Sequence, residues 1–92
     1  MISMKQNTVK PEFVEFIPDY LQEGILYISL EYSTATHKCF CGCGEKVVTP
    51  IRPTEWTLTR NENVVSLNPS IGSFSLPCKS HYFIKENKIQ WL

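Results

Sequence analysis

Apolar and polar residues alternate over several short stretches of this chain, a pattern that is typical of half-buried β-strands. The clearest example is ILYISLEYST, which starts at Ile25. In an extended strand Leu26, Ile28 and Leu30 share one face, while the residues between them share the other. This segment is the strongest strand prediction in the chain, and it leads directly into a cluster of cysteines.

Other stretches predict shorter strands. PEFVEFIP, bracketed by Pro11 and Pro18, indicates an edge strand, and EKVVTPI reads as a strand ended by Pro50. Residues 55–60 and 64–67 flank the turn NEN and predict a hairpin. SHYFI and KIQWL, separated by KEN, predict a second hairpin near the C-terminus.

Two segments are predicted to interrupt the strands. NPSIGS, built on Pro69 and Gly72, reads as a turn, and DYLQEG is compatible with one helical turn ending at Gly24. No segment has a 3.6-residue period over ten or more positions. The predicted fold is therefore mainly β: a small domain of antiparallel sheet or hairpins, at residues 11–92, with at most one short helix and a flexible lead-in at residues 1–10.

Composition narrows the functional classes. A domain of 92 residues buries about 60–65% of its unfolded surface, so its core is marginal and a covalent or metal staple would help. Nine basic residues balance nine acidic ones, which argues against a general nucleic-acid binder. The N-terminal stretch lacks the pattern of a signal peptide, and no apolar run approaches the ~20 residues that span a bilayer. These features predict a cytoplasmic protein.

Six soft metal ligands are concentrated in two short motifs, HKCFCGCG and CKSH. In order they are His37, Cys39, Cys41, Cys43, Cys78 and His81. In a reducing compartment such a mixture favours a metal site over disulfides or over free buried thiols. Zinc is the expected metal, because it takes sulfur and imidazole ligands in a tetrahedral arrangement.

The expected ligand shell is Cys39, Cys41, Cys43 and Cys78, with His81 as the replacement for one of the first three. The α-carbons of strand residues i and i+2 lie roughly 6.5–7 Å apart, so the backbone must curl before these cysteines can share one metal. The glycines at 42 and 44 allow this curl. A closed four-ligand shell would be structural, whereas three ligands with a bound water would be catalytic. His37 remains open as a ligand, a hydrogen-bond donor or a catalytic base.

The serines offer a second kind of chemistry. Ser70, in the predicted turn, or Ser80 could act as a nucleophile with His37 or His81 as the base and Glu31 as its orienting acid. The simpler interpretation is that Ser70 only stabilises a turn. A further alternative places Glu45 beside a zinc-bound water as an acid or base; as a surface turn residue it would need no such role.

Taken together, these motifs resemble a small bacterial family of formerly unknown function. Its signature reads E-Y-x-T-A-x-H-x-C-x-C-G-C-G, then P-S-I-G, then C-[KR]-S-H-Y-[FW]-I, and the similarity runs from about Leu26 to Trp91. All the fixed positions of the signature are present here. Those with chemical side chains of interest are Glu31, His37, Cys39, Cys41, Cys43, Ser70, Cys78, Ser80 and His81.

The family is associated with bacterial operons for ubiquitin-like conjugation, some of them linked to phage defence. The resemblance implies a zinc-binding protein that works with a ubiquitin-like protein and with activating- and conjugating-enzyme-like proteins. It favours a peptidase that matures the ubiquitin-like protein or removes it from targets. The alternative is a non-catalytic zinc module that binds the ubiquitin-like protein or the conjugating enzyme.

Overall fold

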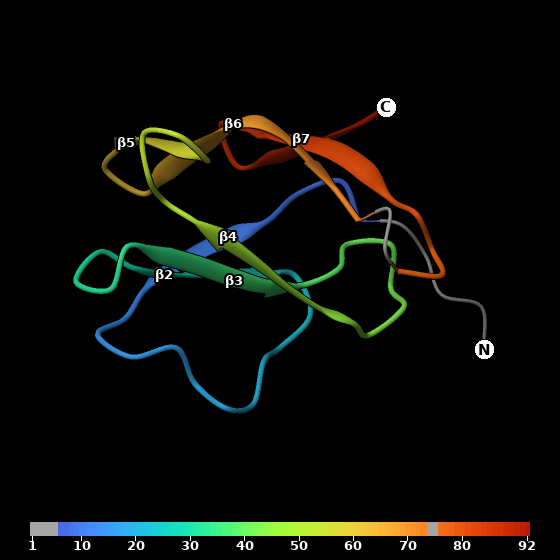
Figure 1. Cartoon of the computed structure of the whole chain (residues 1–92), viewed down its shortest axis with the longest axis horizontal. Coiled ribbons are helices and arrows are strands. Elements are labelled where there is room, and N and C mark those ends of the chain that lie inside the picture. Colours follow the sequence, from blue (N-terminus) through green and yellow to red (C-terminus); the bar gives the residue numbers. More distant parts are fainter. Residues whose placement is uncertain (1–5, 74–75) are drawn as a thin grey trace.

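The computed structural model describes residues 6–73 and 76–92, which form eight β-strands and no helix. The strands make two four-stranded sheets, and Figure 1 shows the sheets lying one above the other. Within each sheet the spatial order of the strands is their order in the chain, so each strand lies beside the one that follows it. The mainly-β fold predicted from the sequence is confirmed.

The first sheet is formed by the N-terminal half of the chain. It contains β1 (Lys10–Phe13), β2 (Ile25–Ser29), β3 (Thr34–Lys38) and β4 (Lys46–Pro50). β1 pairs in parallel with β2, and the two remaining pairs are antiparallel. β4 is therefore an edge strand, and the cysteine loop at residues 39–45 connects it to β3.

The second sheet is wholly antiparallel. It contains β5 (Thr57–Asn61), β6 (Val64–Gly72), β7 (His81–Lys85) and β8 (Lys88–Trp91). The pairing of β6 with β7 changes register between Leu67 and Ile71. β6 also extends beyond β5, because its last partner there is Asn68, opposite Thr57. Within residues 6–73 and 76–92, residues 69–72 therefore have no paired strand on the β5 side.

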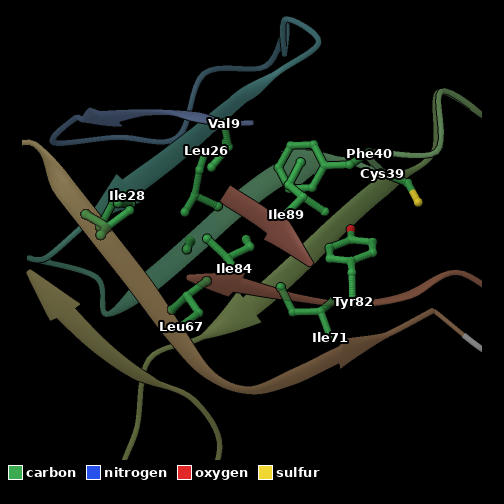
Figure 2. Close-up of a cluster of buried hydrophobic side chains, with 12 residues drawn as sticks. Val9, Leu26, Ile28, Cys39, Phe40, Leu67, Ile71, Tyr82, Ile84 and Ile89 are labelled. Carbon is green, nitrogen blue, oxygen red and sulfur yellow. The ribbon is translucent and has the colours of Figure 1, made fainter. Parts of the chain in front are cut away.

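The core lies between the sheets, as Figure 2 shows for side chains such as Leu26, Leu67 and Ile84. Its buried members are Val9, Leu26, Ile28, Ala35, Cys39, Phe40, Val65, Leu67, Ile71, Tyr82, Ile84 and Ile89. Tyr27 and Ser29, on the other face of β2, are also buried. The connection between β1 and β2 covers them: Ser29 Oγ donates to the Glu15 carbonyl at 2.7 Å, and the Gln22 N–H donates to the Tyr27 hydroxyl at 3.0 Å.

Three local expectations differ from the structure. ILYISLEYST is not one strand, because the chain turns at residues 30–33 and returns as β3, leaving Leu30 52% exposed. NPSIGS is not a turn but the second half of β6, where neighbouring β7 provides backbone partners. DYLQEG forms bends and a turn instead of a helical turn. In the first two cases, pairing of β2 with β3 and of β6 with β7 outweighs local propensity.

The segment before β1 joins the second sheet. Thr8 forms an isolated antiparallel bridge with Lys88, and Ile89 N–H donates to the Asn7 carbonyl at 2.8 Å. Val9 is only 6% exposed and belongs to the core. Residues 1–5 of the predicted lead-in lie outside the described residues. Within residues 6–73 and 76–92, no helix is long and apolar enough to cross a membrane.

Candidate metal centre and serine–histidine pair

The cysteine loop between β3 and β4 is tightly curled. Gly42 and Gly44 have φ angles of +90° and +84°, a backbone conformation that only glycine adopts without strain. Two hydrogen bonds close the loop at Cys39: its N–H donates to the Glu45 carbonyl at 2.8 Å, and its carbonyl accepts from Gly42 N–H at 3.1 Å. The curl brings alternate cysteines to one side of the loop.

The β6–β7 loop brings in the fourth sulfur. Cys78 Sγ lies 3.7 Å from that of Cys39 and 3.8 Å from that of Cys43, and the Sγ atoms of Cys39 and Cys41 are 3.5 Å apart. All four Sγ atoms lie within 4.8 Å of one another. Four sulfurs at 2.3 Å from a tetrahedral metal are about 3.8 Å apart, so this set fits such an ion.

The environment of the sulfurs differs across the cluster. Burial raises the pKa of the Cys39 thiol, whereas a hydrogen bond from the Ser80 side chain is the main cause that lowers the pKa of Cys78 to about 6. Cys78 therefore carries thiolate character near neutral pH even without an ion. Because the thiolate is the form that binds metal, and a bound cation favours that form in each neighbouring sulfur, a metal cation is a suitable partner for this cluster.

His37 lies in the hydrophobic core. Its ring stacks on Phe40 at 4.3 Å between centroids, and its Nε2 lies 2.7 Å from the Tyr82 hydroxyl, while Nδ1 is buried without a hydrogen-bond partner. Burial lowers the pKa of His37 to about 3, so the ring is neutral at physiological pH. The cysteine cluster does not include His37. These contacts are those of a buried structural residue.

Replacing Tyr82 with phenylalanine is expected to destabilise the protein by about 1–3 kcal/mol, because it leaves both ring nitrogens of His37 buried without a partner. The measurement is the urea midpoint of unfolding. Tyr27→Phe is the matched control: its hydroxyl accepts one N–H from the exposed Gln22, which water can reach, so the loss should be smaller. Equal losses in the two variants would contradict a special role for the His37–Tyr82 bond.

A serine and a histidine meet on the second sheet. Ser70 Oγ lies 2.8 Å from His81 Nε2, and both residues are partly buried. Ser70 lies where β6 changes register against β7, and such irregularities redirect side chains near functional sites. His81 is the first residue of β7, three positions after the metal-cluster residue Cys78. Cys78 of the candidate metal centre and His81 of the serine–histidine pair are therefore close in the chain, at the end of the β6–β7 loop and the start of β7.

The other candidate residues lie elsewhere. Glu31 is exposed in the turn before β3, whereas the cysteine cluster follows β3; a five-residue strand spans about 17 Å. Figure 1 shows these two loops at opposite ends of the strand. Ser80 is buried and its side chain bonds to Cys78, and Glu45 is exposed in the cysteine loop. His81 lies outside the sulfur cluster, with its Nε2 directed at Ser70.

Sequence reasoning missed one residue with a clear role. Tyr82 has a role that the sequence motifs did not indicate: its hydroxyl lies 2.7 Å from His37 Nε2, and its ring packs edge-on to Trp91 at 5.0 Å. A buried tyrosine normally finds a hydrogen-bond partner. The same rule could have indicated from the sequence that Tyr82 makes a buried hydrogen bond, because Tyr82 follows His81 in a predicted strand with apolar neighbours.

Comparison with known proteins gives a family match. The model of a family described as "Bacterial ubiquitination-like system serine protease (BubE)" matches residues 13–92, which include the four cysteines, Ser70 and His81. No curated protein and no solved structure matches this chain. The match covers most of the 92 residues, and it agrees with the resemblance to a bacterial ubiquitin-like conjugation family noted in the sequence. The chain therefore belongs to the BubE family of bacterial ubiquitination-like systems.

Proposed function

We propose that this protein is a serine peptidase in which Ser70 is the nucleophile and His81 the general base. The observation that carries the proposal is the 2.8 Å separation of Ser70 Oγ and His81 Nε2, which is hydrogen-bond distance for proton transfer. The description of the family as a serine protease supports it. The pair is partly exposed, so a substrate can approach it.

The chemistry follows from this geometry. Ser70 Oγ attacks the carbonyl carbon of the scissile bond while His81 takes the hydroxyl proton. His81 then returns the proton to the leaving group as that bond breaks, and an ester on Ser70 remains. Water, deprotonated by the same histidine, hydrolyses the ester and restores both residues. His37, neutral and enclosed by Phe40 and Tyr82, and Glu31, at the far end of β3, take no part in this proposal.

For the metal centre, we infer a structural zinc ion held by Cys39, Cys41, Cys43 and Cys78. Four thiolates complete a tetrahedral shell and leave no position for a reactive water, which favours a structural over a catalytic ion. Glu45 then needs no catalytic role. The ion would join the β3–β4 loop to the β6–β7 loop and hold the segment that leads into His81.

The proposed substrates are the ubiquitin-like protein of the system, as a precursor, or its conjugates with other proteins. This follows from membership of a family that belongs to a ubiquitination-like system. The activating- and conjugating-enzyme-like proteins of the same system would produce the conjugates, and hence supply the bonds that this protein cleaves.

A fluorophosphonate probe tests whether Ser70 is activated. The probe forms a stable phosphonate ester only with a serine whose proton is taken by a nearby base. We expect mass spectrometry to locate one label at Ser70 and none at Ser66, whose Oγ instead accepts the Glu86 N–H at 2.8 Å. His81→Gln should slow labelling at least about 100-fold, the usual contribution of a general base. An unlabelled Ser70 would favour the non-catalytic binding module.

A further inference from the structure

A groove lies between β4, the edge strand of the first sheet, and the end of β6 in the second sheet. It has a volume of about 210 Å³. Its walls are residues of β4 on one side and residues at and after the end of β6 on the other: Lys46, Val47, Val48, Gly72, Ser73 and Leu76. The sheets are joined beyond the far end of β4, where Ile51 and Trp56 form an isolated bridge. The groove lies at the opposite end of β4, where the two strand edges face each other without pairing.

The β4 wall presents unused backbone groups. Cys39 N–H donates a hydrogen bond of 2.8 Å to the carbonyl of Glu45, the residue just before β4, so Cys39 and Glu45 form a hydrogen-bonded pair. Bonded and unbonded pairs alternate along antiparallel strands, so Lys46 and Val48 belong to unbonded pairs with β3. Their N–H and C=O groups therefore point away from β3 and toward the open edge. Pro50 follows the same rule, because its carbonyl accepts a hydrogen bond from outside β3, at 3.3 Å.

The β6 wall also presents outward-pointing backbone groups, at Gly72. Ser73 N–H donates to the Ser80 carbonyl at 2.7 Å, so the neighbouring Gly72–His81 pair is an unbonded one. The His81 carbonyl agrees with this, since it accepts from Leu92 N–H at 3.0 Å on the other side of β7. Gly72 N–H and C=O therefore point away from β7, on the side that β5 does not reach.

These backbone groups remain available to a ligand. Among the described residues, Lys46, Val48 and Gly72 make no backbone hydrogen bond outside their own strand pairs. All three are exposed. Strand edges with unpaired N–H and C=O groups are templates for an added strand, and natural proteins use them to bind extended peptides.

One wall residue of the groove, Gly72, is close to the reactive pair in the sheet. Gly72 is the cross-strand partner of His81 and lies two residues after Ser70 on the same strand. A peptide that pairs with the Gly72 edge therefore runs past Ser70. With no side chain, Gly72 also leaves the peptide backbone room to approach. The volume is below the ~300–1,000 Å³ of sites for drug-sized ligands, which favours a segment with small side chains.

We propose that this groove is the substrate channel, and that an extended segment of the ubiquitin-like protein binds there as an added β-strand between Val48 of β4 and Gly72 of β6. The proposal rests on the serine peptidase function proposed above and adds to it the conformation and the position of the substrate. The main chain of the segment supplies the hydrogen bonds, and small side chains allow it to enter. Its scissile carbonyl then reaches Ser70.

Val48→Pro tests the channel, because it removes the outward N–H without removing a bond to β3. Losing one main-chain hydrogen bond should raise the KM for the full-length ubiquitin-like precursor about tenfold. Arg60→Pro is the matched control. Val65, the β6 partner of Arg60, uses both its N–H and its carbonyl to bond with Asn87, so it makes no backbone bond to Arg60. The Arg60 N–H therefore also points to an open strand edge, but to that of β5, which lies outside the groove. Arg60→Pro should leave KM unchanged.

A second measurement covers the outcome in which Val48→Pro fails to fold. The Ser70→Ala protein is mixed with the ubiquitin-like precursor, and amide hydrogen exchange is followed by NMR. The Lys46, Val48 and Gly72 amides should exchange at least about tenfold more slowly on binding, and the Arg60 amide should not change. Unprotected groove amides in a saturated complex, or equal KM values for folded Val48→Pro and wild type, would overturn the channel. If the wild type does not cleave the precursor but its groove amides are still protected, the proposed peptidase function is wrong and the proposed binding of the segment in the groove stands.

Discussion

Replacing Ser70 with alanine is expected to lower cleavage of the ubiquitin-like precursor by about 1,000-fold or more. Removing the nucleophile of a serine hydrolase eliminates the covalent route, and the remaining residues of the site give only a small fraction of the rate. The 2.8 Å contact between Ser70 Oγ and His81 Nε2 is the reason to expect this loss at Ser70. The measurement is the rate of precursor cleavage, followed by gel or mass spectrometry under single-turnover conditions.

Ser66→Ala is the control for that experiment. Ser66 lies on the same strand and its Oγ accepts a hydrogen bond from the backbone of Glu86, so its removal tests the effect of deleting a β6 hydroxyl without touching His81. Cleavage by Ser66→Ala should stay within about twofold of wild type, as expected of a surface substitution worth under ~0.5 kcal/mol. Undiminished cleavage by Ser70→Ala would remove Ser70 from the mechanism.

Removing the metal is expected to unfold the domain. Structural zinc contributes apparent binding energies of about 10–16 kcal/mol near neutral pH, and a whole domain is stable by only about 5–15 kcal/mol. The four sulfurs come from two loops that the chain separates by more than thirty residues, so the proposed ion would link distant segments of the chain. Circular dichroism and bound-metal analysis, before and after chelation, measure the loss. Added zinc should restore both signals.

Cys39→Ser tests the same point by mutation. Cys39 is the buried member of the cluster and its sulfur lies within 3.7 Å of two others, so its loss should abolish metal binding and the cooperative unfolding transition. Glu45→Gln is the matched control, because Glu45 is exposed in the same loop and contributes no sulfur. It should keep one metal ion per chain. A chelated wild type that keeps its native spectrum would show that the cysteines do not hold the fold together.

The strands were largely predictable because their signal is local. Alternation along ILYIS, EKVVTP and the C-terminal hairpin placed β2, β4, β7 and β8 within a few residues of their positions. The prediction failed where a strand is defined by its neighbour. NPSIGS contains proline, asparagine and glycine, which favour turns, yet it continues β6 because β7 pairs with it. Tyr27 and Ser29 are buried because the β1–β2 connection covers them, which alternation cannot indicate.

The sequence by itself indicated the cysteine centre. The ligand types, their spacing and the two glycines that curl the loop are all local features, and four cysteines in such an arrangement favour a metal site over other roles. Only the tertiary structure decided which histidine meets a serine. Ser70 and His81 join through the register of β6 against β7, and His37 is enclosed by Phe40 and Tyr82 from other parts of the chain. Register and burial depend on contacts between distant segments, and a single-residue shift moves a side chain to the opposite face of its sheet.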